Sequence, residues 1–243
     1  MVKVIVPISG GKDSQTCLKL ACQSFPKKDI LALFCDTQFE HPITYTHIKK
    51  IIELYDVNFV SISGGSVIEK VIKYNRFPMG GARFCTDELK MRETKLFCKQ
   101  LALQQKEGFD LWYGMRLGES INRKKKYTGY LDTEKYKMHE IFPGKYPKYL
   151  EKLGVFMRLP ILNWTDTDVF DFLGDEINPL YSMGFDRVGC FPCLAAGDTT
   201  KEKAFNFDDF GRQQHQKVIW LEELTEKSVW SNEEKHGCSL CSI

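Results

Sequence analysis

The sequence predicts an α/β fold in which helices cover both faces of a parallel sheet. Short apolar runs alternate along most of the chain with longer segments whose apolar residues recur at helical spacing. The first apolar run leads directly into a glycine-rich loop at residues 9–14. Because binding sites in parallel sheets lie at the carboxyl ends of the strands, we expect a functional site around this loop.

The strands are predicted from continuous apolar runs, which are typical of strands buried on both faces. They are residues 2–8, 30–35, 57–62, 111–115 and 156–159. The second run ends at Cys35 and is followed by the polar segment DTQFEHP, so polar residues again gather where a strand ends.

The helices are predicted from apolar residues that return to the same face. They are residues 13–24, 42–55, 88–106, a helix that starts after Thr165, and 212–226. In the second of these, Ile48, Ile51 and Tyr55 are in register. Thr165 is a plausible N-cap because an acidic residue, Asp168, follows three positions later.

Length and composition suit one large domain with a small appendage. The chain has 243 residues, of which 43% are hydrophobic and 27% charged. We place a boundary between a nucleotide-binding domain at 1–164 and a helical, cysteine-rich C-terminal part at 165–243 that packs on it. No apolar run reaches the ~20 residues of a membrane helix, and no signal-peptide pattern is seen, so we predict a cytoplasmic protein without a membrane partner.

Charge does not indicate a general polyanion-binding protein. The formal net charge is only +2, which excludes a strong global field. One stretch, residues 123–149, is nevertheless basic, aromatic and rich in turns. It is the candidate contact for a nucleic acid, although the run Lys124, Lys125 and Lys126 resembles a solvated surface loop.

The loop at residues 9–14 reads SGGKDS and has the composition of a phosphate-binding turn. Gly10 and Gly11 permit positive φ and close approach of the backbone, so that main-chain amides and the following helix N-terminus point at an anion. Lys12 adds a positive charge, and Ser9 and Ser14 add hydroxyls. This set predicts a cradle for a pyrophosphate group.

Two points about this loop stay open at this level. Asp13 is expected either to hold a magnesium ion or to cap the helix. The spacing matches neither the P-loop nor the dinucleotide-binding fingerprint, and a glycine-rich turn without a ligand is the alternative.

The string SGGKDS is closely similar to the motif of the PP-loop ATP pyrophosphatase superfamily. The resemblance implies a Rossmann-like fold of the adenine nucleotide alpha hydrolase type. It also implies that ATP is cleaved between the α and β phosphates, that an acceptor is adenylated, and that the loop holds the leaving pyrophosphate.

Further segments resemble one branch of that superfamily, the phosphoadenosine phosphosulfate (PAPS) reductase-like proteins. In family order they are CDTQFEHPITY, ARFCTDELK, GMRLGESINRKK, RLPILNWTDTDVFDFL and NPLYSMGFDRVGCFPC. The resemblance implies that Asp36 and Thr37 border the adenosine, and that an arginine, a cysteine and a lysine of the second segment face the active site.

Four cations lie in or beside these segments, at Arg83, Lys90, Arg116 and Arg123. Fixed cations stabilise phosphate oxygens as charge shifts in a transition state, although a solvated surface is the alternative for each. The expected catalytic residues are Lys12, Asp13, Arg116 and Arg123. The expected nucleotide-binding residues are Ser9, Gly10, Gly11, Lys12, Asp13, Ser14, Asp36, Thr37, Arg83, Lys90 and Gly114.

Two departures distinguish the chain from the sulfonucleotide reductases of this branch. Those enzymes have largely lost the loop lysine, whereas Lys12 is present here. Their tail resembles Glu-Cys-Gly-Leu-His, whereas this chain ends HGCSLCSI. We therefore favour ATP cleavage over thioredoxin-linked reduction of a sulfonucleotide. A catalytically silent nucleotide- or cluster-binding subunit of a larger assembly is a third hypothesis.

The nine cysteines fall into two groups. Cys17, Cys22, Cys35 and Cys98 lie in helix-like or strand-like patterns and are interpreted as small buried hydrophobes. The remaining five include two C-x-x-C pairs, Cys190 with Cys193 and Cys238 with Cys241. Two such pairs can form a Cys₄ site for zinc or for an iron–sulfur cluster.

The resemblance adds Cys85 to this group, because iron–sulfur members of the branch use a cysteine at this position. The pattern is most similar to the ATP-hydrolysing component of DNA phosphorothioation. We expect a [4Fe–4S] cluster on Cys85, Cys190 and Cys193, with Cys238 or Cys241 as fourth ligand. A zinc site, a redox-active disulfide in the tail and unliganded thiols are the alternatives.

The combined hypothesis is an enzyme that binds ATP with Mg²⁺, cleaves it to AMP and pyrophosphate, and couples this to sulfur transfer or activation. Its partners would be a sulfur acceptor, with nucleic acid as a candidate, a sulfur donor protein, and further copies of the chain in a homo-oligomer.

Overall fold

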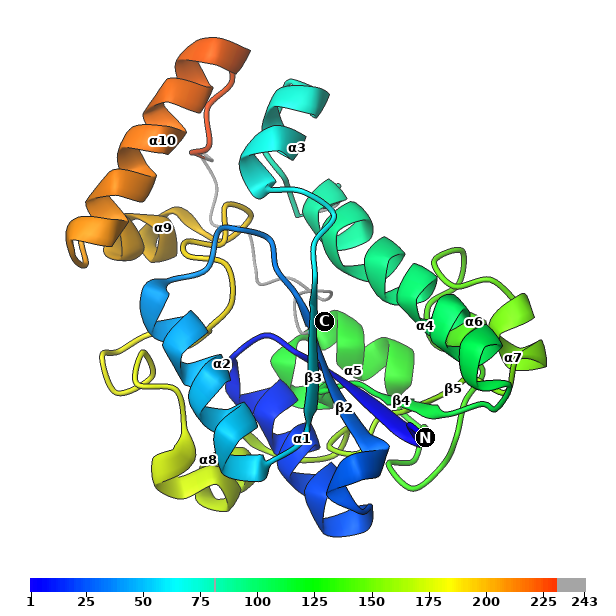
Figure 1. Cartoon of the computed structure of the whole chain (residues 1–243). Coiled ribbons are helices and arrows are strands. Elements are labelled where there is room, and N and C mark those ends of the chain that lie inside the picture. The colour runs from blue at the N-terminus through cyan, green and yellow to red at the C-terminus, as the bar shows by residue number, and fades with distance from the viewer. Residues whose placement is uncertain (81, 231–243) are drawn as a thin grey trace.

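A five-stranded parallel sheet forms the centre of the computed structural model, which describes residues 1–80 and 82–230 (Figure 1). The strands lie in the order β3-β2-β1-β4-β5. Their bounds are β1 (Val4–Ile8), β2 (Ile30–Cys35), β3 (Asn58–Ile62), β4 (Asp110–Trp112) and β5 (Phe156–Arg158). The predicted α/β class and parallel sheet are confirmed.

The order of the strands creates a switch point beside β1. The chain moves outward from β1 to β2 and β3, and then returns to the other side of β1 for β4 and β5. At such a point the connections diverge to opposite sides and leave a crevice at the carboxyl ends of the strands. The loop after β1 and the segment after β4 border this crevice.

Helices cover both faces of the sheet, as predicted. Their bounds are α1 (Lys12–Ser24), α2 (Pro42–Tyr55), α3 (Val67–Tyr74), α4 (Arg92–Gln105), α5 (Ile121–Tyr127), α6 (Met138–Ile141), α7 (Tyr149–Lys152), α8 (Asp166–Leu173), α9 (Asp198–Phe205) and α10 (Asp209–Thr225). Val4 and Val6 of β1 face α1 and α2, whereas Ile5 faces the core beneath α4, α6 and α7.

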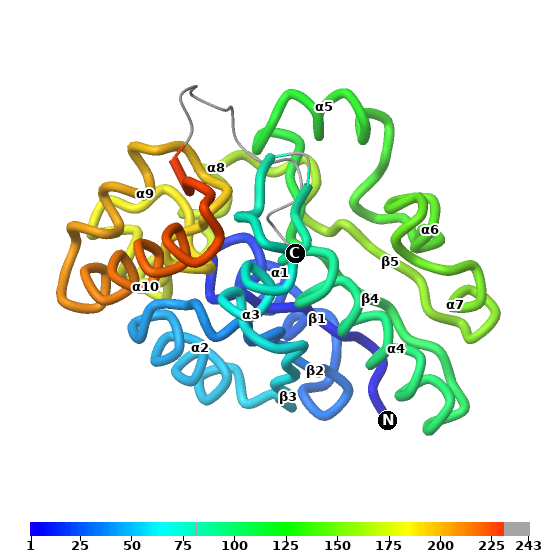
Figure 2. The backbone as a smooth tube through the Cα atoms, turned by 90° about the horizontal axis from the view of Figure 1, so that it is seen from above, coloured from blue at the N-terminus to red at the C-terminus, as the bar shows by residue number. Residues whose placement is uncertain are grey.

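The C-terminal helices add a third hydrophobic cluster at the carboxyl ends of the strands. Val218 and Leu221 of α10 pack there with Val71 of α3 and with Phe39 from the loop after β2. Seen from above, α9 and α10 lie on the side of α2 and α3, while α5 and α6 lie on the side of β5 (Figure 2). The boundary after residue 164 stays a prediction.

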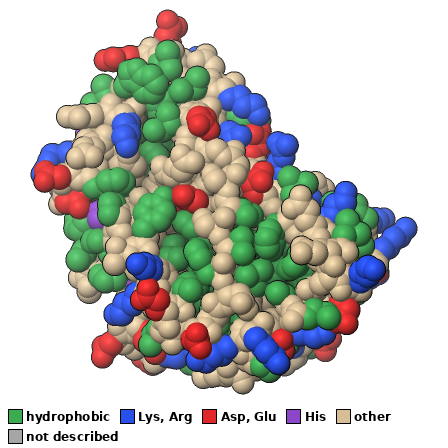
Figure 3. Space-filling model, viewed as in Figure 1, with side chains coloured by type: hydrophobic (Ala, Val, Ile, Leu, Met, Phe, Trp, Pro, Cys, Tyr) green, Lys and Arg blue, Asp and Glu red, His purple; other side chains and the backbone are tan. Residues whose placement is uncertain are grey.

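The edge strand β3 lies at the front of the view in Figure 1. Its residues are mostly exposed, and Phe59 is 41% exposed. Figure 3 shows hydrophobic side chains on this face between the helices that flank the sheet. The buried strands β2 and β1 lie behind it.

Several elements differ from the sequence prediction. The helix expected over 88–106 is a π-helical segment, Cys85–Met91, continued by α4. β4 ends at Trp112 because the chain turns at Gly114 to pass the loop after β1. The lysine run interpreted as a loop is helical: it lies in α5, whose N-cap Ser120 accepts a hydrogen bond from the Arg123 amide.

The predicted start of α8 is confirmed. Thr165 accepts a hydrogen bond from the Asp168 amide, and the Asp168 carboxylate accepts one from the Thr165 amide, which together form a capping box. α10 begins three residues earlier than predicted, because Asp208 caps it through the amide of Gly211.

In the part of the chain that the structure describes, no helix is both long and apolar enough to cross a membrane. Cys17 and Cys98 are fully buried and Cys35 is nearly so, in agreement with their interpretation as core residues, whereas Cys22 is half-buried.

Candidate active site

The loop after β1 contains two glycines that no other residue could replace without a clash. Gly10 has a φ of +74°, and a Cβ at this position would lie 2.6 Å from Cγ2 of Thr44 on α2. A Cβ on Gly11 would lie 2.9 Å from the carbonyl oxygen of Val188. Real Cβ atoms do not approach so closely, so packing requires both glycines, and the left-handed backbone is a second reason for glycine at Gly10.

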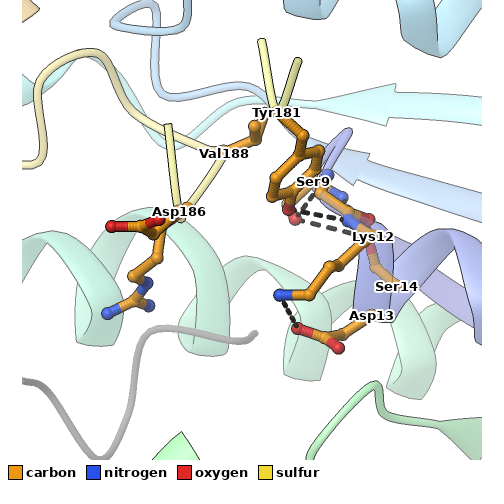
Figure 4. Close-up of a pocket in the computed structure, with 9 residues that line it drawn as sticks. Ser9, Lys12, Asp13, Ser14, Tyr181, Asp186 and Val188 are labelled. Carbon is orange, nitrogen blue, oxygen red and sulfur yellow. Dashed lines mark hydrogen bonds and ion pairs between the residues drawn. The ribbon is translucent and has the colours of Figure 1, made fainter. Parts of the chain in front are cut away.

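The two serines of the loop bond to the loop itself. The Ser14 hydroxyl donates to the carbonyl oxygen of Gly11 at 2.9 Å and accepts from the Ser9 amide at 3.1 Å. The Ser9 Oγ lies 3.3 Å from the Ser14 Oγ (Figure 4). These bonds fix the curvature of the turn before any ligand binds.

Helix α1 starts inside the loop, so its first amides point into the crevice. Its N-cap is Gly11, and no side chain caps it. The hypothesis that Asp13 caps the helix is therefore wrong. The amide of Lys12 instead donates to the hydroxyl of Tyr181 at 2.9 Å, and the Asn178 side chain donates to the carbonyl oxygen of Gly10 at 3.0 Å.

A charged network surrounds the loop. Lys12 Nζ lies 3.1 Å from Oδ1 of Asp166 and 3.7 Å from Oδ2 of Asp13. The guanidinium of Arg116 lies 2.6 Å from Asp13 and 2.8 Å from Asp166. Three of the four predicted catalytic residues are thus brought together, and the structure adds Asp166, which the sequence interpretation missed.

This network is largely shielded from water, although Asp166 itself is exposed. Arg116 is 2% exposed and Lys12 is 6% exposed. The Lys12 ammonium also lies 5.3 Å from the ring centroid of Tyr181 and 5.6 Å from that of Phe170. Burial alone would raise the pKa of the Asp166 carboxyl. The hydrogen bond from Lys12 and the positive charges of Lys12 and Arg116 outweigh this effect, so the pKa of Asp166 lies below its usual value.

Gly114 brings the segment after β4 against the loop. A Cβ there would lie 2.7 Å from the carbonyl oxygen of Asp13 and 2.8 Å from the amide of Ser14. The predicted Gly-x-Arg stretch therefore contacts the loop directly. The backbone of Gly114 packs against it because no side chain intervenes, and the guanidinium of Arg116 forms an ion pair with Asp13.

Arg123 and Arg83 are placed differently. Arg123 is buried at 1% exposure and forms an ion pair with Glu119 one turn earlier. Arg83 is buried just before the π-helical segment. Neither residue lines the pocket at the loop, whose wall is formed by Ser9, Gly11, Lys12, Asp13, Ser14, Tyr181, Asp186, Arg187 and Val188. Their predicted roles stay predictions.

A second pocket adjoins the loop and shares Ser9, Arg187 and Val188 with the first. Its wall includes three of the predicted cysteine ligands, Cys85, Cys190 and Cys193, together with Lys90. Residues far apart in the sequence thus meet beside the loop at residues 9–14, at the carboxyl edge of the sheet.

The segment after β2 contacts this cysteine pocket. The buried Thr37 hydroxyl donates to Glu40 at 2.6 Å and lies 3.3 Å from Sγ of Cys190. Asp36 accepts bonds from the Gln38 amide and the Tyr45 hydroxyl. Neither Asp36 nor Thr37 lines the loop pocket, so their predicted contact with adenosine stays a prediction.

With the site described, comparison with known proteins gives its family. The sequence model of the phosphoadenosine phosphosulfate reductase domain matches residues 3–196. The chain belongs to this PAPS reductase domain family. This agrees with the resemblance to PAPS reductase-like proteins that the sequence motifs indicated.

The sequence is also similar to individual curated proteins. An uncharacterized protein from Methanocaldococcus jannaschii is 30% identical over 195 residues, which cover 79% of this chain and 36% of that protein. The chain thus spans well under half the length of this relative.

Two solved structures are similar at low sequence identity. PAPS reductase from Candida auris is 16% identical, with a TM-score of 0.48, over 79% of this chain and 82% of that one. The U34-tRNA thiolase NcsA from Methanococcus maripaludis, solved with its [4Fe–4S] cluster, is 14% identical, with a TM-score of 0.44, over 100% of this chain and 80% of that one.

Among residues 1–80 and 82–230 of this family member, no three His, Cys, Asp or Glu side chains are grouped so as to hold one metal ion. Cys238 and Cys241 lie outside the described residues. Burial raises the pKa of Cys190 to about 12; Lys90 opposes this increase, whereas Glu40 and Cys85 add to it. A cation bound among these sulfurs would instead lower the pKa of the Cys190 thiol, because a positive charge favours the thiolate.

Proposed function

We propose that this chain binds ATP with Mg²⁺, cleaves it to AMP and pyrophosphate, and couples the cleavage to sulfur transfer or activation. The observation that carries the proposal is the placement of Lys12. Its ammonium is buried in a glycine loop at a helix N-terminus, 3.1 Å from Asp166 and beside Arg116. A fixed cation at this point matches a group that leaves with increased negative charge.

In the proposed reaction, a nucleophile on the acceptor attacks the α-phosphorus, and the bond from that phosphorus to the bridging oxygen breaks. The electron pair leaves with pyrophosphate, and the adenylyl group is then bonded to the acceptor. A sulfur nucleophile from the donor would next attack the activated acceptor and displace AMP, which takes the electron pair of the broken bond. The amides at the start of α1 and the Lys12 ammonium neutralise this group. Asp13, the carboxylate inside the loop, would hold Mg²⁺ together with the phosphates. Arg116 keeps Asp13 oriented through its 2.6 Å contact.

We further propose that Cys85, Cys190 and Cys193 hold a [4Fe–4S] cluster with Cys238 or Cys241, and that zinc is the alternative. Support comes from the shared pocket that the first three cysteines line. Thiolate sulfurs are the ligands that iron–sulfur clusters use. When bound, the cluster would supply a site for sulfur next to the activated acceptor. Because the pocket shares Ser9 with the phosphate loop, both reactants would meet there.

A nucleic acid is the acceptor that the surface favours. Helix α5 carries three successive lysines, Lys124, Lys125 and Lys126, which are all exposed. Lysines on a helix contact phosphates and make binding salt-dependent. Replacing Lys125 by Glu should weaken binding of RNA or DNA and reduce its salt dependence. A sulfur donor protein, a homo-oligomer and a cytoplasmic location also belong to this proposal.

The ATP reaction is tested by incubating the anaerobically purified full chain with ATP, Mg²⁺ and candidate acceptors, and measuring AMP and pyrophosphate. Lys12→Gln should abolish the release. Lys19→Gln is a matched control on the same helix, since Lys19 pairs with Glu176 instead. Sulfite formed from a sulfonucleotide and thioredoxin without pyrophosphate release would establish the reductase alternative. Activity that appears only with an added partner protein would establish the subunit alternative.

The cluster is tested by the absorption spectrum and by the iron content of protein purified without air. We expect a brown preparation that loses iron in Cys190→Ser and keeps it in Cys22→Ser, because Cys22 lies on α1 and packs against the hydrophobic core. A colourless preparation containing zinc would contradict the cluster.

A further inference from the structure

Tyr181 occupies an unusual position at the phosphate loop. Its hydroxyl oxygen accepts the amide hydrogen of Lys12 at 2.9 Å, across 169 positions of sequence. That amide belongs to the first turn of α1, where main-chain N–H groups have no partner within the helix. In an anion-binding loop such an amide is available to a ligand oxygen. Here a phenol oxygen takes that place (Figure 4).

The backbone of Val188 lies on the other side of the same oxygen. A Cβ built on Gly11 would lie 3.4 Å from this oxygen and 2.9 Å from the Val188 carbonyl, so the oxygen lies between the loop and the segment opposite. A main-chain amide at a helix N-terminus, such as that of Lys12, is a donor that proteins use to bind an oxyanion.

The surroundings of the phenol oxygen also suit an anion. The Lys12 ammonium lies 5.3 Å from the ring centroid of Tyr181. Arg187 lines the same pocket and favours negative charge at the hydroxyl, whereas Asp13 opposes it. The hydroxyl itself is neutral, because a phenol keeps its proton at neutral pH and burial raises its pKa further. A phosphate oxygen would carry the charge for which the site is built.

The ring of Tyr181 is held independently of its hydroxyl. The amide of Tyr181 donates to the carbonyl oxygen of Asn178, and the fully buried Asn178 side chain anchors the turn to Gly10. The ring packs edge-on against Phe170, with centroids 5.8 Å apart. A phenylalanine would keep these contacts, so the hydroxyl can be removed without removing the ring.

We propose that the Tyr181 hydroxyl occupies the position of a pyrophosphate oxygen in the nucleotide-free chain, and that the pyrophosphate group of a bound nucleotide displaces it from the Lys12 amide. This rests on the proposed function, in which the loop binds that group. Tyr181 is then a positioning residue: it keeps the amide of Lys12 satisfied until ligand arrives, and it competes with the ligand for that amide.

The test is calorimetric binding of pyrophosphate to the full chain at fixed Mg²⁺. Breaking one hydrogen bond costs a bound ligand roughly 0.5–1.5 kcal/mol, so Tyr181→Phe should bind pyrophosphate about two- to tenfold more tightly. The free variant should melt at a lower temperature, and pyrophosphate should raise its melting temperature by more than in the wild type. A purely structural hydroxyl would lower the melting temperature alone.

Tyr55→Phe is the matched control, because its buried hydroxyl donates to Glu176 at 2.6 Å, away from the loop. It should lower the melting temperature and leave the pyrophosphate Kd unchanged. If the wild type binds pyrophosphate and Tyr181→Phe binds it equally or more weakly, displacement is wrong while the proposed function stands. If the wild type binds no pyrophosphate, the proposed function is wrong as well.

A measurement on the wild type keeps the test independent of how the variant folds. Crystals soaked with pyrophosphate should show a phosphate oxygen within about 3 Å of the Lys12 amide nitrogen and the Tyr181 hydroxyl moved away. Pyrophosphate bound in the loop with the Tyr181–Lys12 bond intact would overturn the proposal.

Discussion

The Arg116 side chain places its Nε 2.6 Å from Oδ1 of Asp13 and its Nη2 2.8 Å from Oδ1 of Asp166. One guanidinium therefore joins the end of β4, the phosphate loop and the first turn of α8. Because Arg116 is 2% exposed, its removal would leave the largely buried carboxylate of Asp13 with the longer, 3.7 Å contact to Lys12. The residue thus supports both the fold and the charge balance at Lys12.

Arg116→Lys keeps the charge but loses the planar fork that bridges two carboxylates. We expect the free energy of unfolding to fall by about 2–4 kcal/mol and pyrophosphate release from ATP to fall at least about tenfold. Urea denaturation and a pyrophosphate assay measure the two effects. Arg92→Lys, on the exposed side of α4, should change neither. Unchanged stability of Arg116→Lys would show that one carboxylate contact is sufficient.

Asp166→Asn should strengthen anion binding at the loop. The substitution removes a negative charge 3.1 Å from Lys12, so the local potential becomes more positive and pyrophosphate should bind several-fold more tightly at low salt. Asp171→Asn is the control, because it removes the same charge from an exposed position of α8. Titration calorimetry at two salt concentrations measures the effect. Weaker binding of pyrophosphate to Asp166→Asn would mean that the main effect of the Asp166 carboxylate is to orient Lys12, and that its competition with the ligand for Lys12 is the smaller effect.

Gly114→Ala should displace the phosphate loop. Its Cβ would lie 2.7 Å from the carbonyl oxygen of Asp13, which is backbone and cannot rotate away. We expect a loss of about 1–3 kcal/mol in stability together with weaker ATP binding. Gly118→Ala is the matched control, since nothing lies within 4 Å of a Cβ there. Thermal denaturation of both variants with and without ATP measures the two effects. If the two variants have the same melting temperature and the same shift with ATP, the close contact at Gly114 is wrong.

Acid should destabilise the fold through His47. Burial, aided by Lys50, lowers the pKa of His47 to about 4, and its Nε2 lies 2.8 Å from Oε1 of Gln15. An unfolded histidine titrates near 6.5, so the unfolded state binds more protons between pH 6.5 and 4, and stability falls as pH decreases through that range. The loss between pH 7 and pH 5 should be about 1–2 kcal/mol.

His47→Gln provides the control for this pH effect, because its side-chain amide can still donate to Gln15 but does not titrate. Urea denaturation at both pH values should show a smaller loss for the variant than for the wild type. Parallel losses would assign the acid sensitivity to other groups.

Local sequence was sufficient for elements whose signals are local. Helix α2 has the predicted bounds because Pro42 favours a helix start and the apolar residues repeat at helical spacing. The α8 capping box was visible as Thr165 and Asp168. Helix α5 was missed, because its short basic sequence has no apolar periodicity and its start depends on a single cap, Ser120.

The contacts between residues of the site were harder to predict from the sequence. Lys12, Asp13 and Arg116 were identified from motif segments, and the structure brings them together. Asp166 and Tyr181 lie within quoted segments, yet nothing in those segments shows that they reach a loop more than 150 residues away. Arg123 was grouped with the site by its segment, but in the structure it pairs with Glu119.

The sequence by itself determined the parallel α/β sheet, the glycine-rich loop after the first strand and the family, because apolar periodicity, glycine positions and contiguous motifs are properties of neighbouring residues. Only the tertiary structure decided which side chains surround Lys12 and which cysteines share a pocket. Those contacts depend on the strand order β3-β2-β1-β4-β5, which brings the ends of distant segments to one crevice. Pairings at such separations follow from how the chain packs as a whole, and no local pattern encodes them.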